Sequence, residues 1–353
     1  MSISSFGRRR FMAFAGAAVL TGCSAKSRFS VSQQPEAAAG VQPLFVATSR
    51  AADPVPIAYG KERANRLSFA QLSISVPHAH QAGNIELPPS NTVDPAKHFA
   101  LVGAKTLPGA DSFVRAVQRD AAQSSEEAVL FVHGYNNNFS DSVYRHAQIA
   151  WDYELRGPQI HFAWPSAAHP LEYAYDRDSV LIARDHLATL LRTLLHKNGL
   201  RLSLVGHSMG SLLIMEALRQ IGLTDRQGTI DKLASVTLVS PDIDMDLFRS
   251  QAASLGRLPQ PFIVAVAQND RLLGLASGLS GGAARLGSVE DLDQLEALGI
   301  STIDMTGLGN GGNNHFLPGT SSAAIALIKG LREAAPGPLS TLTLGPVNIT
   351  LSR

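Results

Sequence analysis

The sequence predicts an α/β protein built around a doubly wound, mostly parallel sheet with antiparallel strands at its N-terminal side. Short apolar runs suited to buried strands recur along the chain, and helical patterns separate them from about residue 110 onward. The first three runs have no helix between them, which favours antiparallel pairing there. Because no internal repeat or interdomain linker is visible, we expect a single domain over residues 41–335.

Nine apolar runs are expected to form strands, and six stretches with helical periodicity are expected to form helices. The strands are expected at 44–47, 69–76, 99–102, 128–132, 160–164, 202–205, 236–239, 262–267 and 302–305. The helices are expected at 112–122, 140–155, 179–195, 211–221, 292–298 and 321–334. The C-terminal tail, residues 336–353, is rich in Pro, Gly and Thr and is either loose or an added edge strand.

The composition excludes several classes of protein. Of the 353 residues, 45% are hydrophobic and 17% are charged, which excludes a disordered, strongly solvated chain. The formal net charge is +1, and without Arg8, Arg9 and Arg10 it becomes −2, from 27 basic and 29 acidic residues. This balance gives no sign of nucleic-acid binding. The single cysteine, Cys23, cannot form a disulfide within its own chain, so stability must come from packing.

The first 22 residues have the pattern of an export signal peptide. Arg8, Arg9 and Arg10 precede an uncharged run of about ten residues, too short for the ~20 residues of a membrane-spanning helix. Residues 20–23, Leu-Thr-Gly-Cys, resemble a bacterial lipobox, in which the cysteine is acylated and becomes the first residue of the mature chain. We therefore expect lipidation of Cys23.

These features predict where the protein acts. We expect an exported bacterial lipoprotein on the periplasmic face of a membrane, with the outer membrane favoured. Both the general secretory route and the twin-arginine route remain open. Residues 23–40 show no periodicity and are expected to form a flexible tether between the lipid and the domain.

A candidate nucleophile lies between a predicted strand and a predicted helix. Residues 206–210, Gly-His-Ser-Met-Gly, form a nucleophile elbow, in which small residues flank a serine on a strained turn. The elbow exposes Ser208 and places the Met209 backbone N–H at a helix start, where it can stabilise an oxyanion. Residues 278–282 also fit the Gly-x-Ser-x-Gly string, but no strand directly precedes them, so we interpret them as a loop.

A serine nucleophile needs a base and a carboxylate that orients it. In hydrolases whose serine lies on a nucleophile elbow, the histidine base follows the serine in the chain. Of the eleven histidines, only His315 follows Ser208. Asp270, at the end of the next-to-last predicted parallel strand, is the favoured acid, and Asp242 and Asp244 are the alternatives.

A second oxyanion donor is expected in the loop that follows the strand at 128–132. Gly134 allows close approach of the backbone, and the N–H of Tyr135 is the expected donor beside that of Met209. His133 is interpreted as a hydrogen-bonding brace rather than as a second base. Trp164, at the end of another predicted strand, either lines an acyl pocket or covers the core.

Together these residues resemble a known family, the bacterial α/β-hydrolase proteins catalogued as a domain of unknown function and described as esterase/lipase-like. The resemblance runs from about Leu44 to the last helix near Leu331. It rests on residues 47–50, 131–136, 162–166, Tyr175 with Asp176 or Asp178, 207–210, 240–244, 269–270 and 285–287. It implies an α/β-hydrolase fold with Ser208, Asp270 and His315 as the triad, and it leaves the substrate open.

The leading functional hypothesis is a serine hydrolase that cleaves carboxylic esters through an acyl-enzyme on Ser208. Acyltransfer by the same triad, and a non-catalytic, lipid-anchored binding or scaffold role, are the alternatives. No cofactor or metal is expected, and His78 and His80 are interpreted as a solvated loop. The expected partners are an ester of unknown size and the membrane. The oligomeric state is left open.

Overall fold

The computed structural model describes residues 28–53, 57–89, 92–196, 200–267, 270–279, 284–288, 293–308, 314–333, 341–344 and 347–350. The expected signal peptide and Cys23 lie outside these residues. The described strands form one sheet in the order β10-β11-β9-β8-β7-β6-β4-β5-β1-β2-β3. Their bounds are Gly40–Ala52 (β1), Tyr59–Val76 (β2), Ala100–Leu107 (β3), Ala128–Val132 (β4), Gln159–Ala163 (β5), Leu202–His207 (β6), Leu233–Val239 (β7), Phe262–Val266 (β8), Ser301–Asp304 (β9), Thr341–Leu344 (β10) and Val347–Thr350 (β11).

The central strands of the sheet are parallel, and both margins are antiparallel. Strand β1 pairs in parallel with β5, and parallel pairing continues through β4, β6, β7 and β8 to β9. Strands β1, β2 and β3 pair antiparallel, as do β9, β11 and β10. The predicted fold class is therefore confirmed. The open question about the tail is answered for its described residues, which add two strands to the sheet, with β10 at the edge and β11 between β10 and β9.

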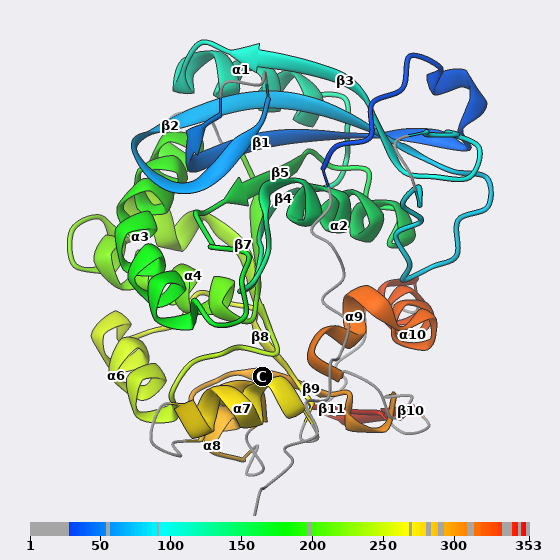
Figure 1. Cartoon of the computed structure of the whole chain (residues 1–353). Helices are drawn as coiled ribbons and strands as arrows, with labels where there is room; N and C mark the ends of the chain where they lie inside the picture. Colours follow the sequence, from blue (N-terminus) through cyan, green and yellow to red (C-terminus); the bar gives the residue numbers. More distant parts are fainter. Residues whose placement is uncertain are drawn as a thin grey trace, which may run out of the picture.

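Helices cover both faces of the sheet (Figure 1). Their bounds are Ala110–Ala121 (α1), Phe139–Asp152 (α2), Tyr173–His196 (α3), Met209–Gly222 (α4), Arg226–Thr229 (α5), Met245–Leu255 (α6), Arg271–Leu279 (α7), Asp293–Glu296 (α8), Leu317–Thr320 (α9) and Ser322–Glu333 (α10). Helices α1, α3, α4 and α6 contact one another on one face, and α2 and α9 lie together on the other. None of the described helices is both long and apolar enough to span a membrane.

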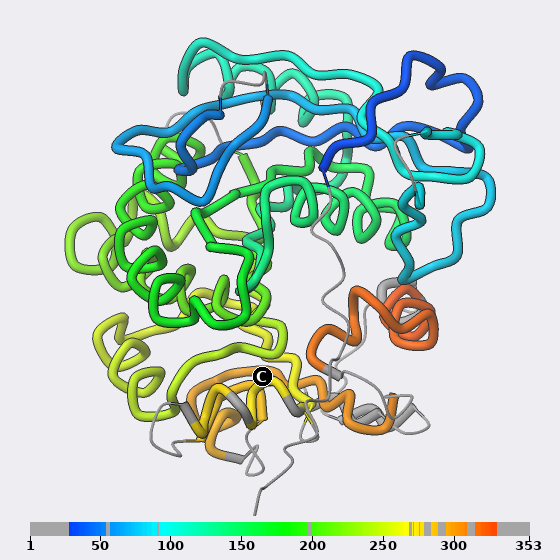
Figure 2. The backbone as a smooth tube through the Cα atoms, in the orientation of Figure 1, coloured from blue at the N-terminus to red at the C-terminus, as the bar shows by residue number. Residues whose placement is uncertain are grey.

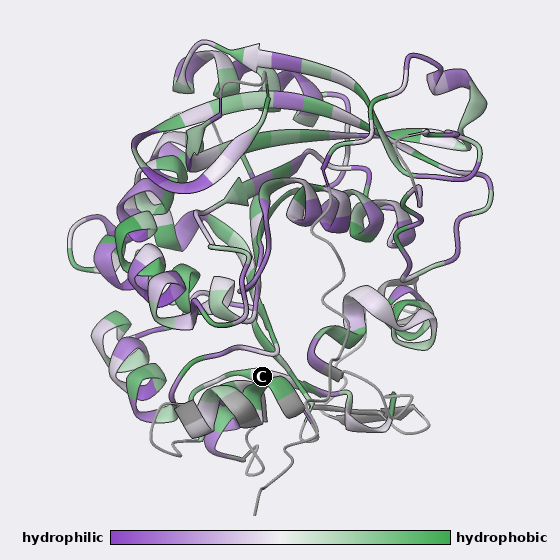
Figure 3. Cartoon of the chain, viewed as in Figure 1, coloured by the Kyte–Doolittle hydropathy of each residue, from purple (hydrophilic) through white to green (hydrophobic). Residues whose placement is uncertain are grey.

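The hydropathy pattern explains this layering. The short central strands are mostly apolar, as suits strands covered on both faces, and Figure 3 shows green along much of their length, between helices that alternate green and purple. All five residues of β5 are buried. On α6 the buried residues Met245, Phe248, Ala252 and Leu255 recur at helical spacing and face the core.

The N-terminal segment before β1 contacts the domain. The Phe29 ring packs edge-on against Phe139 and Tyr144, with centroids 5.7 and 5.4 Å apart. Backbone hydrogen bonds join Ser30 and Ser32 to Leu101 of β3. Figure 2 shows this dark blue segment running beside the cyan part of the chain. The described part of the expected tether therefore lies on the fold, and β1 begins one residue before the expected domain boundary at 41.

Candidate active site

Ser208 occupies the tight turn between β6 and α4. Its backbone angles, φ 53° and ψ −122°, lie in a region that serine rarely adopts. The turn is held by hydrogen bonds from its N–H to Val239 O at 2.9 Å and from Asp242 N to its carbonyl at 3.2 Å. Strand β7, which ends at Val239, therefore fixes the conformation of the elbow.

Gly210 is required by the close approach of α4 to β4. A Cβ atom there would lie 2.4 Å from the carbonyl oxygens of Val132 and His133. Any side chain would thus push the helix away from the sheet. This matches the sequence expectation that small residues flank the candidate nucleophile.

The structure brings Asp270 and His315 together. His315 Nδ1 lies 2.7 Å from Asp270 Oδ2, and both residues are almost fully buried. The other carboxylate oxygen of Asp270 accepts the backbone N–H groups of Leu272 and Leu273 at 3.0 and 3.1 Å, at the start of α7. The helix start thus fixes the carboxylate through Oδ1. Its Oδ2 can then orient the imidazole of His315 through Nδ1.

The imidazole of His315 lies close to the elbow. His207 directly precedes Ser208, and its ring centroid is 4.9 Å from that of His315. His207 also packs on Phe316, with centroids 3.9 Å apart. Burial, followed by the charge of His315, lowers the pKa of His207 well below its ordinary value, so this imidazole stays neutral. The sequence predicts no role for His207 beyond its place in the elbow. Its packing against His315 and Phe316 is visible only in the structure.

The two alternative acids are engaged elsewhere. Asp242 accepts the Tyr173 hydroxyl at 2.8 Å and lies 3.5 Å from Nε of the buried Arg285. Asp244 caps α6 by accepting the backbone N–H groups of Asp246 and Leu247 at 3.0 Å. The geometry therefore favours Asp270 as the partner of His315, and its catalytic role stays a prediction.

The loop after β4 lies directly against Ser208. A Cβ atom on Gly134 would be 3.0 Å from Ser208 Cβ and 2.7 Å from His207 Nδ1, so only glycine allows this approach. Tyr135 directly follows Gly134 on this loop, and Met209 directly follows Ser208 as the first residue of α4. Both expected oxyanion donors thus come from backbone segments that adjoin the nucleophile.

His133 has the surroundings of a brace. Its Nδ1 lies 2.8 Å from Gly134 O and its Nε2 3.1 Å from Trp164 O, and its ring stacks on that of Trp164 at 5.0 Å. Burial lowers the pKa of His133 to about 3, so it is neutral at physiological pH. Trp164 is itself fully buried in the main core and donates its Nε1–H to His133 O at 2.7 Å. Of the two interpretations of Trp164, the structure supports core packing.

The described residues contain no group of three or more His, Cys, Asp or Glu side chains arranged to hold a metal ion. His80 differs from the solvated-loop expectation. Its ring lies between two carboxylates, 2.8 Å from Glu86 and 2.7 Å from Asp152, and it ties its loop to the end of α2.

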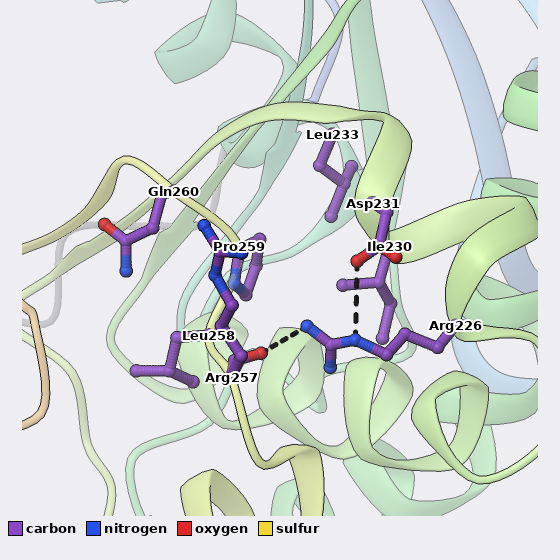
Figure 4. A pocket seen from close by; sticks show the side chains of 8 residues that line it. All are labelled: Arg226, Ile230, Asp231, Leu233, Arg257, Leu258, Pro259 and Gln260. Atoms are coloured by element: carbon purple, nitrogen blue, oxygen red, sulfur yellow. Dashed lines mark hydrogen bonds and ion pairs between the residues drawn. The ribbon is translucent and has the colours of Figure 1, made fainter.

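A surface pocket of about 300 Å³ lies at the opposite edge of the sheet, before the starts of β7 and β8 (Figure 4). Arg226 in this pocket already donates to the carbonyls of Leu255 and Arg257 at 2.7 and 2.5 Å, and it pairs with Asp231 at 3.4 Å. Because Ser208 lies at the carboxyl ends of the strands, this pocket is not part of the candidate active site.

The fold and the arrangement around Ser208 together define an α/β hydrolase. Residues 110–332 match the model of a family described as alpha/beta hydrolase of unknown function (DUF900). The chain belongs to this family, since the match covers more than half of its length.

Comparison with other proteins adds distant structural similarity. TT1662 from Thermus thermophilus is 13% identical, with a TM-score of 0.36 over 60% of this chain and 90% of that one. An esterase from Rhizomucor miehei is 12% identical, with a TM-score of 0.35 over 83% and 84% of the two chains. These values are too low to carry an argument about function. No curated protein matches the chain.

Proposed function

We propose that the protein is a serine hydrolase that cleaves carboxylic esters through an acyl-enzyme on Ser208. The observation that supports this most is the 2.7 Å contact between His315 and the buried Asp270, beside a serine held at φ 53°. A scaffold protein needs neither a strained serine nor an oriented imidazole next to it.

In the proposed reaction His315 takes the proton of the Ser208 hydroxyl as its oxygen attacks the ester carbonyl. The resulting oxyanion accepts hydrogen bonds from the backbone N–H groups of Met209 and Tyr135. When this tetrahedral intermediate collapses, the bond between the carbonyl carbon and the alcohol oxygen breaks. The alcohol leaves with the proton from His315. Water then attacks the acyl carbon, again with His315 as base, the bond to Ser208 Oγ breaks, and the acid leaves while His315 returns the proton to Ser208. Asp270 holds the required tautomer and stabilises the imidazolium throughout.

A fluorophosphonate probe followed by mass spectrometry of the modified peptide tests this proposal. We expect an adduct on Ser208, and none in Ser208→Ala. Ser280→Ala is the matched control, because Ser280 lies in the second Gly-x-Ser-x-Gly string, and it should label like the wild type. A protein that unfolds cooperatively on heating and yet takes up no probe would overturn the hydrolase proposal and favour the scaffold role. Product analysis with an added alcohol separates hydrolysis from acyl transfer.

We also propose that the mature protein is anchored to a membrane, on the periplasmic face, through a lipid on Cys23. The support is the sequence alone, from the basic residues and apolar run to the single cysteine. The full chain with Cys23→Ser should lose incorporation of labelled palmitate and leave the membrane fraction. Equal palmitate incorporation in both proteins would contradict the proposal.

A further inference from the structure

Arg50 and Asp176 are two buried charged residues that form hydrogen bonds to the same pair of loops. Arg50 lies near the end of β1 and is 1% exposed, and Asp176 lies in the first turn of α3 and is fully buried. One loop, residues 133–138, follows β4, and the other, residues 164–167, follows β5. Both loops lie at the edge of the sheet that carries Ser208.

Arg50 holds the carbonyl groups of these loops. Its Nη2 donates to Asn137 O at 2.8 Å, and its Nη1 donates to Ser166 O at 3.1 Å. The same Nη1 also donates to Gly60 O at 3.0 Å, which ties the loops to β2. A guanidinium suits this task because it presents several donors in one rigid plane.

Asp176 holds the N–H and hydroxyl groups of the same loops. It accepts Ser166 Oγ–H and Ala167 N–H, each at 2.6 Å, and Asn136 N–H at 3.3 Å. Asn137 N–H donates in turn to Ser166 Oγ at 3.2 Å, which joins one loop to the other. The cation therefore binds the carbonyls, and the anion binds the donors, of two adjacent loops.

From these contacts we propose that Arg50 and Asp176 are positioning residues, which fix the 133–138 loop so that the Tyr135 N–H faces the oxyanion formed at Ser208. The proposal rests on the proposed serine hydrolase function. An oxyanion donor acts only when it lies about 2.7–3.1 Å from the charge that develops, so a loop displaced by about 1 Å loses most of its effect. Asn136, next to Tyr135, has φ 59°, in the left-handed region that asparagine adopts more readily than most residues.

The electrostatics agree with this geometry. Burial lowers the pKa of Arg50 to about 10, which leaves it protonated at neutral pH. Burial also raises the pKa of Asp176, and the charge of Arg50 and the donors at Asp176 oppose that shift. Each charge thus offsets part of the desolvation of the other.

Asp176→Asn tests the proposal with two readouts. Hydrogen exchange of the 133–138 amides should accelerate by about tenfold or more, since the variant replaces an acceptor with a donor at the loop. The rate of fluorophosphonate labelling of Ser208, per folded molecule, should fall by about 10- to 100-fold. This fall does not exceed the one expected when an oxyanion donor is removed altogether, which is about 100- to 1,000-fold. The pH at half-maximal labelling should not move, because the pair of Asp270 and His315 is untouched.

Glu216→Gln is the matched control. Glu216 is also a buried carboxylate, and it accepts Gln251 Nε2–H at 2.7 Å and lies 3.3 Å from an Arg184 nitrogen, away from both loops. It should lower thermal stability and leave the labelling rate and the loop exchange unchanged. If Asp176→Asn does not fold, Arg50→Lys keeps the charge, loses the planar fork, and should give the same two effects in smaller measure.

The outcomes separate this proposal from the hydrolase proposal. A wild-type protein that does not label overturns the hydrolase function and the positioning role with it, whereas the exchange data still report whether the two charges hold the loop. Labelling of the wild type together with unchanged labelling in a folded Asp176→Asn or Arg50→Lys overturns the positioning role alone. Faster loop exchange with slower labelling, against an unaffected Glu216→Gln, supports it.

Discussion

The carboxylate of Asp270 uses its two oxygens for two tasks, and this allows a clean test at the scale of one residue. Oδ1 caps α7, and Oδ2 contacts His315. In Asp270→Asn the amide oxygen can keep the cap, while the amide NH₂ cannot accept from His315 Nδ1. The imidazole is then held in the wrong tautomer. We expect kcat for a test ester to fall by about 10⁴-fold, with little change in melting temperature.

Asp244→Asn is the control for this prediction. Asp244 is one of the alternative acids, and its asparagine variant keeps the oxygen that caps α6. Its kcat should equal that of the wild type. A large loss of kcat in Asp244→Asn, with little in Asp270→Asn, would transfer the role of the acid to Asp244.

At the scale of single residues, the sequence predicts the candidate catalytic residues, but it does not predict the buried charges that hold the neighbouring loops. Ser208, His315 and the choice of Asp270 follow from local pattern and chain order, and the structure brings Asp270 and His315 together. Arg50 and Asp176 stand out in the sequence only through a family resemblance. Their partners lie far away in the chain, and no periodicity in the sequence can reveal such contacts.

Among the elements, capping decides where α6 begins and gives a second prediction. Asp244→Ala removes the side chain that accepts the N–H groups of Asp246 and Leu247. We expect the free energy of unfolding to fall by about 1 kcal/mol, because two donors at the helix start lose their partner. Urea titration measures this change. The labelling rate of Ser208 should not change, and a loss of labelling per folded molecule would show that Asp244 does more than cap α6.

All nine predicted strands were found, whereas the short helices α5 and α9 and the longer helices α6 and α7 were not predicted. For α6 the signal was present, since Asp244 precedes residues with buried positions at helical spacing. An aspartate at a strand end suits both a helix cap and a catalytic acid, and this ambiguity hid the helix start. For α7 the sequence of Arg271–Leu279 contains two glycines, which are poor helix formers, so tertiary contacts rather than local propensity fix this helix.

The whole molecule carries several buried neutral imidazoles, which predict its response to acid. Burial lowers the pKa of His133 and His146 to about 3, and lowers those of His161 and His207 well below the ordinary 6.5. The unfolded chain therefore binds more protons below about pH 6.5. Each such group removes up to about 1.4 kcal/mol of stability per pH unit between its unfolded and folded pKa values.

We therefore expect the melting temperature to fall steeply from pH 7 to pH 5. Burial alone would lower the pKa of His80, but its hydrogen bonds to Asp152 and Glu86 outweigh burial and raise it. His80 therefore acts in the opposite direction, and its stabilising effect is complete below pH 6.5. The stability that this one histidine gains in acid is smaller than the stability lost through the four histidines whose pKa values are lowered. His146→Phe should flatten the pH dependence, since an aromatic ring can still stack on Phe131. Equal melting temperatures at pH 7 and pH 5 would contradict this prediction.

The packing of Phe29 against Phe139 and Tyr144 has a consequence for the proposed lipid-anchored hydrolase. If Cys23 carries the lipid, the chain from it to Phe29 reaches at most about 20 Å even when fully extended. Such a short tether would keep the α/β-hydrolase domain close to the bilayer surface and limit its rotation. Encounter would then occur largely in two dimensions, which favours esters that partition into the membrane over those dilute in the periplasm.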